Sequence, residues 1–132
     1  MGASALKACL MLLSITCLLA AVAGGLLRAA AAPSSWFELH TLGQAAVLHA
    51  ALMMSGFLGT VIAIERAVAV KLPAAFVAPF ASVLGALAML AGHAAIGAWL
   101  SALGALVFVG VNVVVVLRQS ASHTVLMLVG AL

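Results

Sequence analysis

The sequence is poor in charge and contains no tyrosine. Five of its 132 residues are Lys or Arg and two are Asp or Glu, whereas 68% are hydrophobic. A soluble domain usually carries about a quarter charged residues, so this composition excludes a soluble globular protein. The net charge of +3 comes without a dense basic cluster, and nucleic acid is therefore not an expected partner. We expect an all-α protein embedded in the lipid bilayer.

Cysteine is scarce, and the motifs of common catalytic centres are missing. Cys9 and Cys17 lie in one hydrophobic run. On a helix they would be about 12 Å apart along the axis, too far for a disulfide, so both are expected to be packing residues. The sequence has no phosphate loop, paired carboxylates or nucleophile triad. We therefore assign no catalytic residue, and a hydrolytic enzyme is not expected.

Long hydrophobic runs dominate the chain. About 20 apolar residues cross a bilayer as a helix. Runs of that kind cover 8–27, 42–64, 75–97 and 98–117, and a shorter one covers 121–132. We predict one membrane-embedded domain over 1–132, a transmembrane helix bundle with four spans plus the start of a fifth, and the N-terminal portion of a longer protein. A cleavable signal peptide is the alternative for 8–27, but its 20 apolar residues exceed the usual 7–15 or so.

The basic residues predict the orientation. With four spans, one side of the membrane carries four of them and the other side carries only Arg28. The four are Lys7, Arg66, Lys71 and Arg118. Because basic residues favour the inner side, we expect the N-terminus inside. His40, His49 and His93 then lie toward the outer side.

The 42–64 segment, LGQAAVLHAALMMSGFLGTVIAI, contains the main candidate site. On a helix His49, Met53, Gly56 and Thr60 share one narrow face, within about 40° of His49. A small residue such as Gly56 lets a neighbouring helix or a flat cofactor approach closely. An unpartnered imidazole in hydrocarbon is costly, so His49 is expected to face protein.

Three roles remain open for His49: ligation of heme or a metal such as copper, a structural hydrogen bond, and proton or substrate handling. Imidazole nitrogen suits iron and copper. His93 is the candidate second cofactor ligand. Asn112 is the only strongly polar residue inside the fourth run, and a hydrogen bond between helices is its expected role.

Glu65 and Arg66 close the 42–64 segment. Arg66 suits the negative end of a helix dipole, whereas Glu65 does not. We therefore predict that Glu65 pairs with a cation from another element, Arg118 first and Lys71 second. Two separate interfacial charges are the alternative.

Residues 40–70 resemble a known family. The text His49-Ala50-Ala51-Leu52-Met53 and the later Glu65-Arg66 are similar to NnrS-type bacterial membrane proteins, which resemble heme–copper oxidase subunit I. In that subunit an H-G-x-x-M motif supplies an axial heme ligand, and alanine replaces the glycine here. The resemblance implies the bacterial inner membrane, a heme ligand at His49, and respiratory or nitrogen-oxide physiology. Heme–copper catalysis is not carried over, because the other ligands lie on later helices.

Three functions follow as hypotheses. The first is a heme- or metal-binding membrane protein. The second is a transport or permeation protein in which His49, Thr60 and Asn112 line a path. The third is a purely structural membrane subunit that packs against other transmembrane helices.

Overall fold

The computed structural model describes residues 3–31, 33, 35 and 38–132, and every regular element within them is helical. In chain order the elements are α1 (Ala3–Arg28), α2 (His40–Val47), α3 (His49–Ala51), the π-helix η2 (Leu52–Gly59), α4 (Thr60–Val70), the 3₁₀ turn η3 (Pro73–Phe76), α5 (Val77–Leu90), α6 (Ala94–Arg118) and α7 (Ser122–Val129). Within the described ranges, four helices are long and apolar enough to cross a membrane. The predicted all-α membrane fold is confirmed.

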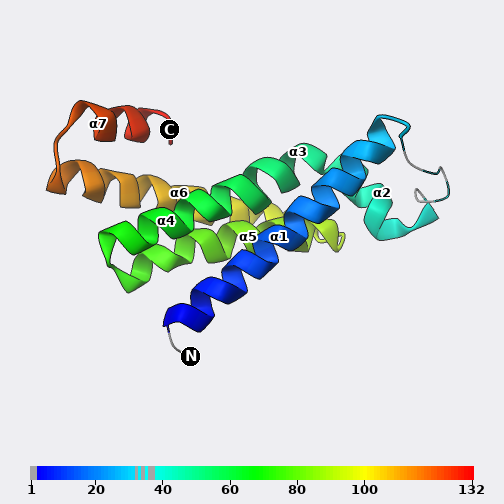
Figure 1. Cartoon of the computed structure of the whole chain (residues 1–132), viewed down its shortest axis with the longest axis horizontal. Coiled ribbons are helices and arrows are strands. Elements are labelled where there is room, and N and C mark those ends of the chain that lie inside the picture. Colours follow the sequence, from blue (N-terminus) through cyan, green and yellow to red (C-terminus); the bar gives the residue numbers. More distant parts are fainter. Residues whose placement is uncertain (1–2, 32, 34, 36–37) are drawn as a thin grey trace.

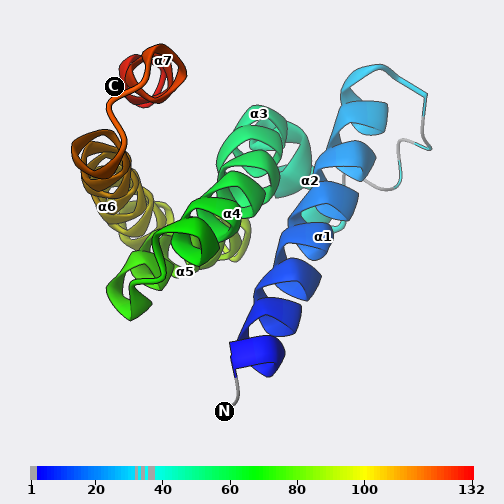
Figure 2. The ribbon, with the colours of Figure 1, turned by 60° about the vertical axis from the view of Figure 1, so that its left-hand side comes forward.

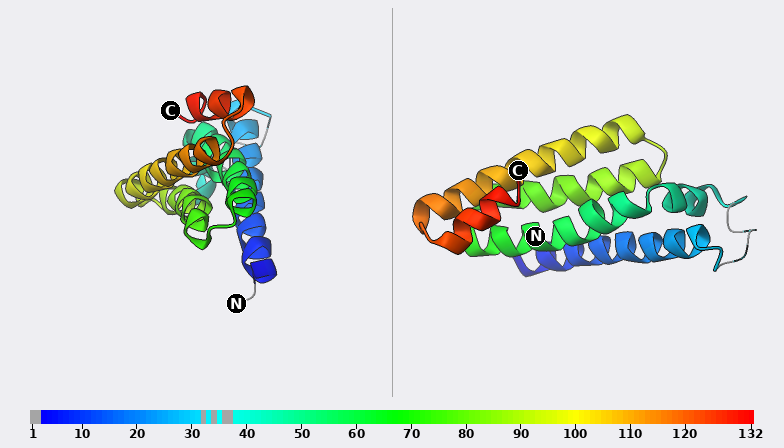
Figure 3. Two further views of the ribbon diagram at one scale, coloured as in Figure 1. Left: turned by 90° about the vertical axis from the view of Figure 1, so that its left-hand side faces the viewer. Right: turned by 90° about the horizontal axis from the view of Figure 1, so that it is seen from above.

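The long helices run up and down in a bundle, with α1 crossing the others at an angle (Figure 1). Two contacts define its ends. At one end Arg118 Nη1 donates to the carbonyl oxygen of Val70 at 2.8 Å, which joins the ends of α6 and α4. At the other end a β-carbon on Gly92 would lie 3.6 Å from His40 Cε1, so the α5–α6 turn lies beside the start of α2. Figure 3 shows these two ends along the length of the bundle.

The 42–64 segment is not the single regular helix that was predicted. Helix starts earlier, at His40, and continues to Val70, but Leu48 interrupts it with φ −92° and ψ 9°. Residues Leu52–Gly59 then form a π-helix. Thr60 Oγ1 donates to the carbonyl oxygen of Ser55 five residues earlier, at 3.2 Å. The wider turn changes which residues share a face, so the angles expected for a uniform α-helix no longer apply.

The boundary between the third and fourth spans also differs from the prediction. α5 ends at Leu90 and α6 begins at Ala94, so the turn lies at 91–93 and not at Gly97. Gly92 makes this turn with φ +88°, a conformation that residues with a β-carbon rarely adopt. Gly97 is instead buried inside α6 and packs against Met89 of α5.

The two terminal helices differ from their predicted ranges in length only. α1 begins at Ala3, before Lys7, since no proline or glycine interrupts helix between the two. α7 covers eight of the residues in 121–132. It folds back from the end of α6 (Figure 1).

The core lies between α1, the 40–70 segment and α5. Its buried residues include Leu10, Cys17, Leu52 and Val83. Neither cysteine forms a disulfide, as predicted. Cys17 is buried, but Cys9 is exposed, so the expectation that both are packing residues is wrong for Cys9. Large hydrophobic side chains also cover the outer faces, for example Leu106 at 72% exposure. Such faces are suited to contact with lipid.

Candidate functional site

His49 faces helix α1, as predicted, and is hydrogen-bonded there. Its Nδ1 lies 2.7 Å from the carbonyl oxygen of Ala21. The ring also packs against Gly25, where a β-carbon would lie 2.8 Å from His49 Cε1. The adjacent Gly24 packs against the backbone of Ala45. The Gly24-Gly25 pair therefore lets α2 and His49 approach α1 closely, and the structural hydrogen bond expected as one role of His49 is present.

This hydrogen bond defines the tautomer of His49. A carbonyl oxygen only accepts, so Nδ1 must carry the proton. The neutral ring then has an unprotonated Nε2. Histidines that bind metals commonly donate their other ring nitrogen to a backbone carbonyl in this way. Nε2 is therefore the ring nitrogen that has a free lone pair.

Gly56 does not provide the space for a flat cofactor that the sequence suggested. A β-carbon on Gly56 would lie 2.9 Å from Ala86 Cβ and 2.9 Å from Cys17 Cβ. The volume beside this glycine is already filled by α1 and α5. A planar group such as heme does not fit there, and the glycine serves helix packing instead.

His93 is not brought into a site with His49. It is an exposed residue that precedes the first turn of α6. Across the described part of the chain, no group of three or more His, Cys, Asp or Glu residues is placed to hold a metal ion. The role of His93 as a second cofactor ligand therefore stays a prediction, and the structure does not place it in one site with His49.

The polar residues Thr60 and Asn112 are both buried, and both are bonded within their own helices. Thr60 donates to Ser55 as described above. Asn112 Nδ2 donates to the carbonyl oxygen of Phe108 at 2.9 Å. The predicted hydrogen bond from Asn112 to another helix is therefore wrong, because the bond that its amide makes goes to the carbonyl one turn back in the same helix. None of the pockets described below is lined by His49, Thr60 or Asn112.

The predicted ion pair of Glu65 is also wrong. Glu65 is exposed, and within the described ranges no salt bridge joins it to Arg118 or Lys71. Arg118 uses its guanidinium on the Val70 carbonyl, and Arg66 Nη2 donates to Met127 Sδ at 3.0 Å. Glu65 and Arg66 thus act as separate interfacial charges, the alternative considered from sequence. Arg66 and Arg118 both line a pocket of about 350 Å³, and α7 forms one of its walls.

A groove between α4 and α6, mainly apolar but containing serines, was not predicted from sequence. It has a volume of about 180 Å³, and its lining residues come from η2, α4, α5 and α6. Figure 2 shows how α4, α5 and α6 are arranged. The lining of the groove contains three serines, Ser55, Ser82 and Ser101. The hydroxyl of Ser101 is buried, and among the described side chains it is the buried polar group that has no hydrogen-bond partner. The remaining lining residues are Met54, Gly59, Ile62, Ala63, Gly104, Ala105 and Phe108.

The π-helix η2 forms part of the wall of this groove. Met54, Ser55 and Gly59 all belong to η2, and π-helical segments are frequent at functional sites. The sequence signal that could have found the groove is the presence of Ser82 and Ser101 in otherwise apolar spans. Ser82 precedes Gly85 by three residues on α5, and Ser101 precedes Gly104 by three residues on α6. The sequence does not show that each serine faces the glycine of the other helix; this is seen only in the folded structure.

Comparison with known proteins assigns the chain to one family. The sequence model described as Domain of unknown function (DUF8744) matches residues 7–132. The chain belongs to this family. No curated protein and no solved structure matches the chain. The family description carries no activity, so the resemblance to NnrS-type proteins remains a prediction.

Proposed function

We propose that this protein is a structural subunit of a membrane assembly in which a second copy of the chain packs over the groove between α4 and α6. The observation that supports this most directly is the set of small residues that lines this groove: Ser55, Gly59, Ala63, Ser82, Ser101, Gly104 and Ala105. Such a surface lets a second transmembrane helix approach closely.

The groove wall itself favours an identical helix as the occupant. Ser55, Gly59 and Ala63 follow one another at four-residue spacing along η2 and α4. Small residues at this spacing let two helices approach closely and are common where identical transmembrane helices pair. In a two-fold dimer this face of one copy would pack against the same face of the other copy. Two-fold dimers are the commonest assemblies.

The test uses one blocking variant and one matched control on α6. Ala105 is exposed and lines the groove, so Ala105→Trp should fill the groove without disturbing the monomer. Leu106 is 72% exposed and lies outside the groove, so Leu106→Trp should have no effect on assembly. We expect a dimer in mild detergent for the wild type and Leu106→Trp, and a monomer for Ala105→Trp. A monomeric wild type in both detergent and nanodiscs would contradict the proposal.

Cross-linking adds a test of the geometry. In a chain with Cys9→Ala and Cys17→Ala, a cysteine at Ser55 should form a disulfide between copies on oxidation. A cysteine at Leu106 should not. Cross-linking of both positions to the same extent would indicate random collision and would overturn the proposed interface.

A second candidate function is ligation of heme or copper by His49. It is supported by the Nδ1 hydrogen bond to Ala21, which leaves Nε2 available as a ligand. The bound group would lie on the Nε2 side and not against Gly56. Protein expressed with sufficient heme should then show a Soret band, which His49→Ala abolishes while Met53→Leu retains it. Metal analysis of the same samples tests copper.

We further propose that the end carrying Lys7, Arg66, Lys71 and Arg118 faces the bacterial cytoplasm, and that the protein resides in the inner membrane. The charge count and the resemblance of residues 40–70 support this placement.

A further inference from the structure

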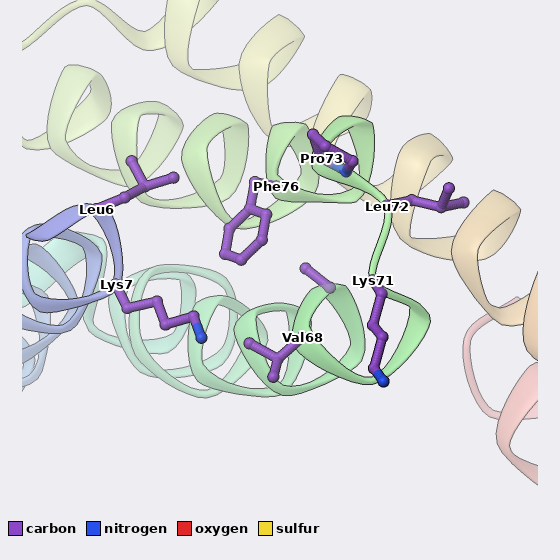
Figure 4. Close-up of a pocket in the computed structure, with 8 residues that line it drawn as sticks. Leu6, Lys7, Val68, Lys71, Leu72, Pro73 and Phe76 are labelled. Carbon is purple, nitrogen blue, oxygen red and sulfur yellow. The ribbon is translucent and has the colours of Figure 1, made fainter. Parts of the chain in front are cut away.

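A third pocket lies at the end of the bundle where α4 finishes. Its volume is about 400 Å³, and α1, α4 and η3 form its walls. Figure 4 shows Phe76 between Lys7 on one wall and Lys71 on the other. The other lining residues are Leu6, Ala67, Val68, Leu72 and Pro73. Lys7 and Lys71 are therefore the two ionisable groups of an otherwise apolar pocket.

The backbone holds Lys71 at this position. Lys71 ends α4 in the left-handed conformation, with φ 58°, and its N–H donates to the Ala67 carbonyl oxygen at 3.2 Å. A cation at the end of a helix is favoured by the helix dipole. Within the described ranges, neither lysine is in a salt bridge, and the exposed carboxylate of α4, Glu65, does not line the pocket. The two ammonium groups thus remain available to an external anion.

The pocket continues into an apolar groove. This groove has a volume of about 470 Å³ and shares Leu6, Pro73 and Phe76 with the pocket that contains Lys7 and Lys71. It then follows one face of α5 away from the charged end, past Val77, Phe80, Ala81 and Leu84, and reaches Leu100 of α6. From Val77 to Leu84 the helix rises about 10 Å. The combined space is cationic at its mouth and apolar along its length.

We propose that this space binds one anionic phospholipid, with the phosphate between Lys7 and Lys71 and an acyl chain along α5. Basic pockets between transmembrane helices are suited to anionic headgroups, and each lysine near the surface attracts them. A free phosphate would leave the apolar groove unused, and a neutral lipid would leave both lysines without a partner. The shape and the charge together therefore select a molecule that carries both an anion and a hydrocarbon chain.

Lipid retention in native mass spectrometry tests this site. The full chain is reconstituted in nanodiscs of phosphatidylglycerol mixed with phosphatidylcholine, released, and its bound lipids are counted. We expect one phosphatidylglycerol to be retained in preference to phosphatidylcholine. The Lys7→Gln, Lys71→Gln double variant should weaken that retention about tenfold or more, since both cations that attract the anionic headgroup are removed.

Three controls make the result decisive. Lys7→Arg with Lys71→Arg keeps both charges and should retain the lipid. Arg28→Gln removes a charge at the opposite end of the bundle and should also retain it. Leu84→Trp fills the apolar groove and should weaken retention while both lysines are present, whereas inorganic phosphate should not displace the lipid. Equal retention of the two lipids by the wild type, or equal loss in Arg28→Gln and the double glutamine variant, would overturn the proposal.

Discussion

Gly85 of α5 and Ser101 of α6 pack so closely that a β-carbon on Gly85 would lie 2.6 Å from Ser101 Oγ. The relationship is repeated in the opposite sense between Gly104 of α6 and Ser82 of α5, where the corresponding distance is also 2.6 Å. Each serine therefore lies against the glycine of the facing helix. We call these four residues the α5–α6 seam, and they hold the two helices together by close approach.

Gly85→Ala should destabilise the bundle, because the added methyl group would overlap the Ser101 hydroxyl. We expect a loss of about 1–3 kcal/mol in the free energy of unfolding, the usual cost of overpacking. Gly110→Ala is the matched control, since nothing lies within 4 Å of its β-position. It should be neutral or stabilising, because alanine is the better helix former. Unfolding in mixed micelles measures both, and equal stability of the two variants would contradict the seam.

Gly25→Ala and His49→Ala should each destabilise the contact between α1 and α3, but their effects should not add. The methyl group of Gly25→Ala meets the imidazole, whereas His49→Ala removes both the ring and its hydrogen bond to Ala21. Interhelical hydrogen bonds in membranes contribute about 0.6–1.7 kcal/mol. Since the added methyl group gains space once the ring is gone, the double variant should be more stable than the sum of the single effects predicts. A double-mutant cycle in the same unfolding assay measures this coupling, and strict additivity would argue against the contact.

Gly92→Ala should destabilise the α5–α6 turn, because Gly92 has φ +88°. A residue with a β-carbon in such a conformation costs about 1–2 kcal/mol. Gly92→Asn should cost less, since asparagine tolerates positive φ better than alanine does. The order Gly, Asn, Ala in melting temperature is the expected outcome. A melting temperature for Gly92→Ala equal to that of the wild type would be inconsistent with the turn at 91–93.

Thiol labelling tests the orientation. In a background with Cys9→Ala and Cys17→Ala, cysteines are placed singly at Ser35 and Leu72, which are both exposed and lie in loops at opposite ends of the bundle. An impermeant maleimide should label Ser35→Cys in intact cells and Leu72→Cys only after the membrane is opened. Labelling of Leu72→Cys from outside the cell would contradict the predicted orientation.

The sequence by itself determined the class of the protein and the number of spans. Hydrophobic runs of about 20 residues are a direct physical consequence of bilayer thickness, and lipid cannot satisfy backbone groups, so helix was the only outcome. The absence of a disulfide between Cys9 and Cys17 and the inward direction of His49 followed from equally local rules. These properties depend on composition and on positions within one helix.

Tertiary structure alone decided where the helices are interrupted and what each polar group contacts. The sequence placed the turn between the third and fourth spans at Gly97, whereas the structure has it at 91–93. The reason is that Gly97 packs against Met89 and Gly85 of α5, while Gly92 has positive φ. The small size of Gly56 is compatible with a cofactor or with a helix, and only the positions of Cys17 and Ala86 show that packing fills the space. Likewise Arg118 meets the Val70 carbonyl and not Glu65, because the direction of a side chain across an interface depends on the crossing of two helices. Sequence spacing within one helix carries no information about that crossing.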